Sequence, residues 1–198
     1  MNQDEDNKRT VPDPSEPEWK ARIESLLAVA LQDNVSAAEA IKKVDQVLST
    51  HREIALRSSQ DRSETLNSLM NIGESYRTLS CYEQALSVNQ EALDLARRLE
   101  DRSAQATLLR KIASILIKYS RWEEAKASLR RSCQIFQSLE DNEGATRCTL
   151  LLGNIQLQCG DHSAAEISYL KSLEAAERID SAPIIADITM NLGILETI

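Results

Sequence analysis

A periodicity of forty residues is the feature of this sequence that most limits its fold. Gly73, Ala113, Gly153 and Gly193 stand forty residues apart, and each follows an Ile or a Leu. Two further sets keep the same interval: Tyr82, Trp122 and His162, and Ala85, Ala125 and Ala165. A period of this length, held over three copies and part of a fourth, indicates a solenoid of stacked repeats.

Each copy reads as a pair of helices. The first helix carries apolar and small residues at the spacing of one helix face: Leu69, Ile72, Gly73 and Tyr76. A small residue on that face lets a neighbouring helix approach closely. The patterns Ser80-x-x-Glu83 and Ser120-x-x-Glu123 predict capping boxes that begin the second helices. Asp101 is predicted to cap the first helix of the next pair.

The pattern resembles the tetratricopeptide repeat, whose units combine a Leu-Gly pair, a nearby aromatic residue, a turn, and an aromatic residue followed by Ala. The resemblance covers residues 61–198. The usual period of that repeat is about 34 residues, so this chain resembles a long variant with a period of forty. The resemblance implies an all-α fold, a right-handed α-solenoid of antiparallel helix pairs.

The chain is therefore predicted to have three parts. Residues 1–14 are polar, charged and rich in Pro, which predicts a disordered tail. Residues 15–60 are out of register with the repeat and predict a degenerate N-terminal helix pair. Residues 61–198 predict the array, with these approximate units: 61–100, 101–140, 141–180 and a partial fourth, 181–198.

Composition and motifs exclude several functional classes. The net charge is −8, and residues 1–18 hold six acids and two bases, so the remaining residues share a net charge of only −4. A body of this kind predicts no nucleic-acid partner, and no apolar run is long enough to cross a membrane. We expect a cytoplasmic protein with reduced cysteines, no cofactor and no catalytic residues. Cys159-x-x-His162 lacks the further ligands of a metal site, so no metal is expected.

The resemblance implies that the first helices of the units line a groove that receives a protein or peptide. The positions predicted to face that groove and bind the partner are Asn71, Arg77, Arg110, Lys111, Lys118, Arg147, Leu150 and Asn154. Glu74 falls at a groove position too. Arg and Lys in the middle of the groove favour an acidic segment, and Leu150 and Leu151 are predicted to act as apolar anchors.

The leading hypothesis is a non-catalytic adaptor or scaffold that binds proteins or peptides in this groove. An alternative is a regulatory or sensor module of a larger signalling protein, such as a cyclase or kinase, that continues beyond Ile198. A second alternative is a self-associating scaffold. It would use an open C-terminal end face on which apolar residues are expected to lack a covering helix: Ile185, Ile188, Leu192 and Leu195.

Overall fold

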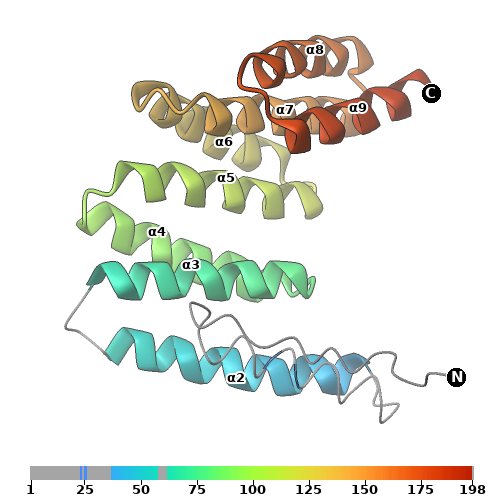
Figure 1. Ribbon diagram of the computed structural model, residues 1–198. Coiled ribbons are helices and arrows are strands. Elements are labelled where there is room, and N and C mark those ends of the chain that lie inside the picture. Colours follow the sequence, from blue (N-terminus) through green and yellow to red (C-terminus); the bar gives the residue numbers. More distant parts are fainter. Residues whose placement is uncertain (1–22, 24, 26–36, 58–61, 198) are drawn as a thin grey trace, which may run out of the picture. The chain divides into compact units, whose positions relative to one another are not determined.

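The computed structural model describes residues 23, 25, 37–57 and 62–197, and every regular element in these residues is a helix (Figure 1). The chain divides into two compact units, residues 1–58 and 59–198. In the first unit α2 spans Ala37–Arg57. The helices of the second unit are α3 (Arg62–Thr78), α4 (Tyr82–Arg98), α5 (Arg102–Lys118), α6 (Trp122–Ser138), α7 (Asn142–Gln158), α8 (His162–Arg178) and α9 (Ala182–Glu196).

The first unit is described mainly in α2. Val44 and Leu48, one turn apart on that helix, are fully buried, while Ile54 and Leu56 are exposed. The buried apolar face of α2 therefore includes Val44 and Leu48 and does not extend to the C-terminal end of the helix. The predicted tail, residues 1–14, lies outside the described residues, as does most of the predicted first helix of the pair in residues 15–60.

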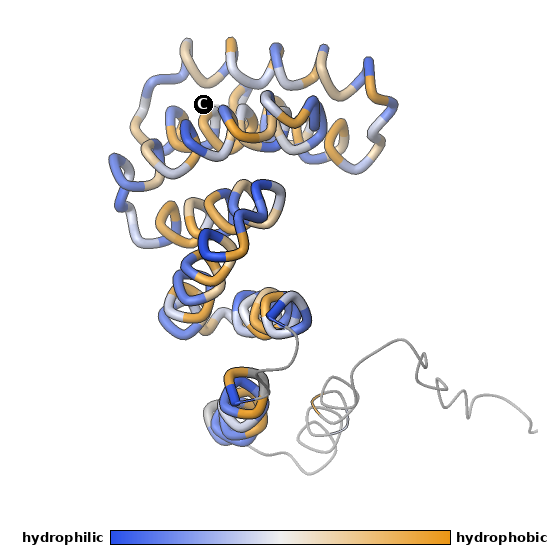
Figure 2. The backbone as a smooth tube through the Cα atoms, turned by 90° about the vertical axis from the view of Figure 1, so that its left-hand side faces the viewer, coloured by the Kyte–Doolittle hydropathy of each residue, from blue (hydrophilic) through white to orange (hydrophobic). Residues whose placement is uncertain are grey.

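The second unit is an α-solenoid of antiparallel helix pairs, as predicted. Helices α3 to α8 each contain 17 residues, so each is about 25 Å long. A new helix begins every twenty residues, which explains the period of forty. Consecutive helices pack together, and α7 also contacts α5 and α9. Each helix of this unit bears both hydrophobic and hydrophilic residues (Figure 2), as expected where one face packs and another meets water.

One residue in the left-handed conformation ends each described helix from α3 to α8. These residues are Ser80, Glu100, Ser120, Glu140 and Asp180, with φ between 52° and 59°, and Gly160, with φ of 78°. The amide after each one turns back onto the helix: Cys81 N donates to the Tyr76 carbonyl at 2.9 Å. This bond satisfies a carbonyl that the helix end leaves free.

The two predicted capping boxes are wrong. Ser80 and Ser120 adopt positive φ and belong to the ends of α3 and α5. Helices α4 and α6 instead begin after Cys81 and Arg121, and neither side chain caps its helix. A Ser in the left-handed conformation cannot also take the extended conformation of an N-cap residue.

Aspartate side chains cap the N-termini of α5, α7 and α8. The Asp101 carboxylate accepts a hydrogen bond from Ala104 N at 2.9 Å, which confirms its predicted role. Asp141 and Asp161 make the equivalent bonds at the starts of α7 and α8, with lengths of 2.7 and 3.2 Å. Each carboxylate satisfies one of the amides that the first helical turn leaves free.

Glycines allow close contacts within and between the pairs. A Cβ atom on Gly73 would lie 2.6 Å from Asn89 Oδ1, and one on Gly153 would lie 2.6 Å from Tyr169 Cε1. These contacts confirm that a small residue brings the two helices of a pair together. Gly144, to which the sequence assigned no packing role, lies just as close to Phe136 of the preceding pair.

The apolar residues of α9 are less open than the sequence predicted. Ile188 is fully buried, and Ile185 and Leu192 are partly buried against the same core cluster, which includes Ala165, Tyr169 and Leu150. The expectation that Ile188 lacks a covering helix is therefore wrong, because α8 packs against α9. The exposed apolar residues of α9 are Met190 and Ile194, with 64% and 45% of their surface accessible.

Candidate peptide-binding groove

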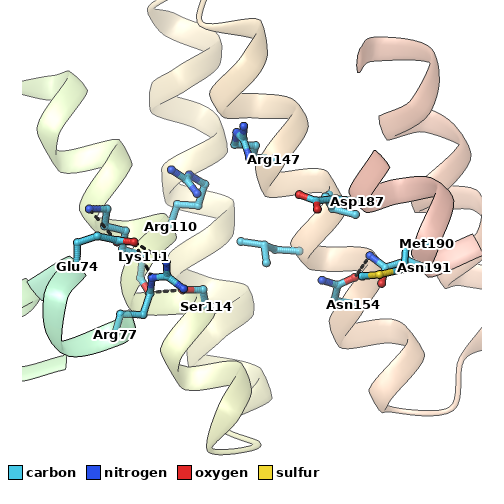
Figure 3. A pocket seen from close by; sticks show the side chains of 12 residues that line it. Glu74, Arg77, Arg110, Lys111, Ser114, Arg147, Asn154, Asp187, Met190 and Asn191 are labelled. Carbon is cyan, nitrogen blue, oxygen red and sulfur yellow. Dashed lines mark hydrogen bonds and ion pairs between the residues drawn. The ribbon is translucent and has the colours of Figure 1, made fainter. Parts of the chain in front are cut away.

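A groove of about 600 Å³ runs across the first helices of the successive pairs. It receives side chains from α3, α5, α7 and α9 (Figure 3). The residues that line it are Glu74, Arg77, Arg110, Lys111, Ser114, Arg147, Leu150, Leu151, Asn154, Asp187, Met190 and Asn191. Four of these side chains are cationic and two are carboxylates, so the lining carries a net positive charge in a chain whose net charge is −8.

The structure brings together six of the eight residues predicted for the groove: Arg77, Arg110, Lys111, Arg147, Leu150 and Asn154. Asn71 on α3 and Lys118 near the end of α5 are exposed and do not line it. The binding role of all eight residues stays a prediction.

Glu74 neutralises one end of the groove. Its carboxylate accepts hydrogen bonds from the Arg77 guanidinium and lies 3.3 Å from Lys111 Nζ. The hydrogen bond from Arg77 is the main reason that the pKa of Glu74 is lowered, and the charge of Lys111 adds to it. The sequence placed Glu74 in the groove, but only the structure shows that it pairs with both cations.

Arg110 is the least compensated cation among the described groove residues. Its Nε atom is buried and has no hydrogen-bond partner, and its guanidinium makes no ion pair within 4 Å in the described part of the chain. Burial is the main cause of the lowered pKa of Arg110, and the like charge of Arg147 also lowers it. Arg147 itself pairs with Glu143, one turn earlier on α7, at 3.1 Å.

The α9 end of the groove combines amide and apolar groups. Asn154 Oδ1 accepts hydrogen bonds from Tyr169 Oη at 2.9 Å and from Asn191 Nδ2 at 3.2 Å. In Figure 3 the amide nitrogen of Asn154 points toward the middle of the groove. Leu151 is half-buried and Met190 is exposed, so both present apolar surface to the groove.

Two predictions about the groove need correction. Leu150 is only 6% exposed and belongs to a core cluster, so Leu151, the other predicted anchor, and Met190 are better placed to contact a ligand. The predicted groove residues also include none from α9, although Asp187, Met190 and Asn191 stand forty residues after Arg147, Leu150 and Leu151. The repeat register was the signal that could have found them.

In the described part of the chain, Cys159 and His162 do not form a metal site. Cys159 and His162 are both exposed, and no group of three or more His, Cys, Asp or Glu in the described residues is arranged to hold a metal ion. Tyr82 packs edge-on against Tyr119, with ring centroids 6.4 Å apart. None of the described helices has both the length and the apolar character needed to cross a bilayer.

A second cavity, of about 510 Å³, lies between α4, α5 and α6. Its floor contains Leu109 and Ile112, and its rim contains Arg97, Arg121 and Arg131. Arg97 pairs with Asp94 and Arg121 with Glu124, each on its own helix. Arg97 and Arg121 are therefore better compensated than Arg110, and the cavity provides a control surface for experiments on the groove.

Comparison with known proteins agrees with this geometry. Residues 64–138 match the tetratricopeptide repeat family. Tetratricopeptide repeat protein 29 of Trypanosoma brucei brucei is 27% identical over 84% of this chain. The alignment covers 34% of that relative, so the chain spans about a third of its length.

Two solved structures share the fold at 15% sequence identity. BtubC (BKLC) from P. vanneervenii has a TM-score of 0.64, with 90% of this chain and 80% of that chain covered. Aspartyl phosphate phosphatase F from Bacillus subtilis also has a TM-score of 0.64, with 85% and 44% covered. At this level of identity the likeness concerns the helical solenoid alone.

Proposed function

This chain belongs to the tetratricopeptide repeat family, and on that premise we propose that it is a non-catalytic adaptor that binds a peptide segment of another protein in the groove. Helical solenoids of this family bind proteins or peptides along the surfaces that their repeats build. The single observation that carries the proposal is the groove itself, which gathers Arg77, Arg110, Lys111 and Arg147 across three successive pairs.

The charge balance supports an acidic partner. The groove lining holds four cations and two carboxylates, Glu74 and Asp187, while the chain as a whole is acidic. A positive groove on an acidic protein attracts acidic segments. Polar side chains such as Asn154 and Ser114 can hydrogen-bond the backbone of an extended peptide.

Affinity purification from native lysate tests this proposal. The bait is the whole chain, compared with the double charge reversal Arg110→Glu with Arg147→Glu. A matched control, Arg97→Glu with Arg131→Glu, makes the same change in net charge around the second cavity. Circular dichroism first establishes that all three baits are helical.

We expect one or more partners that the control retains and the groove reversal loses. Partners retained by both variants would contradict the proposal and direct attention to other surfaces. Partners lost equally from both would mean that net charge, and not the groove, governs the association. A partner that proves to be a second copy of the chain would favour the self-associating scaffold.

A further inference from the structure

We infer that the groove holds two adjoining seats, one for a carboxylate and one for an apolar side chain, and that its ligand is an extended peptide bearing both. The carboxylate seat lies between α5 and α7 and is formed by Arg110 and Arg147. The apolar seat lies between α7 and α9 and is formed by Leu151 and Met190. The inference rests on the proposed function and specifies the ligand of the same groove.

The repeats themselves show that Arg110 is not needed for packing. The equivalent positions in the other three copies hold Met70, Leu150 and Met190. Only the second copy places a charge there, and that charge is partly buried, with its Nε atom buried and unpartnered. A buried charge without a partner destabilises a fold, so a packing role does not account for it.

A carboxylate is the group that this arrangement fits. The Nε–H of a guanidinium and one of its Nη–H groups lie on the same edge and donate two parallel hydrogen bonds to the two oxygens of a carboxylate. On Arg110, Nε is the atom left without an acceptor. A carboxylate bound there would also offset the like charge of Arg147, whose partner Glu143 is 57% exposed.

The other two cations of the groove are less suited to this role. Glu74 contacts both Arg77 and Lys111, so each of these cations has an ion-pair partner and their charges are partly compensated. Among these cations the guanidinium without an ion-pair partner in the described part of the chain is that of Arg110, in the middle of the groove, so an acidic side chain gains most there.

The apolar seat is the next step along the groove. Met190 is 64% exposed, and its unbranched, polarisable side chain can adapt to an apolar group. Leu151 on α7 lines the same end, and the Asn154 amide nitrogen points toward the space between the two seats (Figure 3). That amide is placed to donate a hydrogen bond to a peptide carbonyl.

Helix geometry sets the spacing of the two ligand side chains. The seats are separated by one step in the row of first helices, and the axes of packed helices are about 8–10 Å apart. An extended peptide advances about 3.3 Å per residue. Successive side chains of an extended peptide point to opposite faces. The acidic and apolar side chains of the ligand, which both face the groove, should therefore be about two or four residues apart.

Selection from a displayed library of short random peptides tests this directly, with the whole chain as target. We expect enriched sequences to share an Asp or Glu about two or four residues from a large apolar residue. The inference would be overturned if the enriched sequences lacked an acidic residue or showed no preferred spacing. It would also be overturned if no sequence were enriched. The proposed function would survive such a result if the lysate experiment still gave a partner that depends on the groove.

Variants then test the two seats by fluorescence anisotropy with one selected peptide. Arg110→Met should weaken binding by about 10- to 100-fold, and Arg110→Lys by about tenfold, because Lys keeps the charge but lacks the planar pair of donors. Met190→Ser should weaken it several-fold. The control Arg97→Gln, at the second cavity and outside the groove, should change the dissociation constant by less than about threefold.

The substitution Arg110→Met also separates binding from folding. It installs the residue found at the equivalent position of two other repeats, so the variant should unfold at the same or a higher temperature while it binds less tightly. Unchanged binding would overturn the carboxylate seat. A peptide with phosphoserine in place of its acidic residue that binds more than about tenfold tighter would instead make the seat a phosphate site.

Discussion

The second and third helix pairs share one scaffold and carry different chemistry on it. Each pair has two helices of 17 residues, separated by the same short turn. At equivalent groove positions, however, α5 carries Arg110 and Lys111 where α7 carries Leu150 and Leu151. The packing positions therefore maintain the repeat geometry, while the groove positions are free to vary and to determine what is bound.

The two pairs also reach the same packing with different residues. In the third pair Gly153 lies against the ring of Tyr169. The equivalent positions of the second pair hold Ala113 and Leu129, both fully buried. A smaller residue on the first helix thus accompanies a larger one on the second helix, which keeps the packed volume similar.

The largest change in stability is expected when Gly153 is replaced without a compensating change at Tyr169. Gly153→Ala places a Cβ atom 2.6 Å from Tyr169 Cε1 and should lower the free energy of unfolding by about 1–3 kcal/mol. Adding Tyr169→Leu imports the arrangement of the second pair and should restore part of the loss. Urea unfolding followed by circular dichroism measures both changes.

Gly193→Ala is the matched control, because Gly193 has the same repeat position and nothing within 4 Å of an added Cβ atom. It should raise the free energy of unfolding by up to about 1 kcal/mol, through the better helix propensity of Ala. Equal effects of the two Gly→Ala substitutions would show that close packing does not explain the glycine of the third pair.

The buried thiol of the third pair should make its stability depend on alkaline pH. Burial raises the pKa of Cys148 from 9.0 to about 11, and the equivalent residue of the second pair is Leu108. The folded state keeps this proton above pH 9 while the unfolded state loses it. The contribution is therefore complete below about pH 9 and falls by about 2 kcal/mol as the pH rises to about 11.

Other groups also titrate in this range, so the test compares the wild-type protein with Cys148→Ala. The difference between their free energies of unfolding should shrink as the pH rises through this window, because the variant has no thiol to ionise. A difference that stays constant with pH would contradict the raised pKa of Cys148.

The turn inside each pair offers a third comparison. Gly160 ends α7 with φ of 78°, and Ser120 ends α5 with φ of 56°. Gly160→Ala should cost about 1–2 kcal/mol because a Cβ atom disfavours the left-handed conformation. Ser120→Gly should raise stability by removing the same strain. Thermal unfolding of both variants would show shifts of opposite sign, and shifts of the same sign would contradict this account.

The smallest change in stability is expected at the N-termini of the second helices of the pairs. Asp161 caps α8 through a 3.2 Å bond to Ala164 N, whereas the equivalent Arg121 makes no cap for α6. Asp161→Ala should therefore cost about 0.5–1 kcal/mol. Arg121→Ala should leave the stability nearly unchanged, since its ion pair with Glu124 is exposed. Chemical unfolding resolves the difference, and equal losses would argue against the cap.

Sequence patterns predicted the helices better than their ends. The spacing of Leu69, Ile72 and Gly73 identified a helix face, and Asp101 was recognised as a cap. The patterns Ser80-x-x-Glu83 and Ser120-x-x-Glu123 were misread, because a Ser before a helix can either cap it or end the preceding helix. Only the backbone conformation distinguishes these roles, and at both serines φ is positive.

The repeat register placed six of the eight predicted residues in one groove, yet it left their chemistry undecided. It did not show that Glu74 pairs with Arg77 and Lys111, or that Arg110 Nε is buried without an acceptor. It also assigned Leu150 to the ligand, whereas α9 covers that side chain.

By itself the sequence determined the solenoid, its period and the faces on which its helices pack, because these follow from residue spacings within one helix and from their regular return. The tertiary structure decided which charges of the groove are neutralised and which remain available. Glu74 and Lys111 are 37 residues apart in the chain, as are Arg110 and Arg147. Whether such side chains pair, repel or stay apart depends on how neighbouring helices pack, because electrostatic energies change steeply with distance and burial.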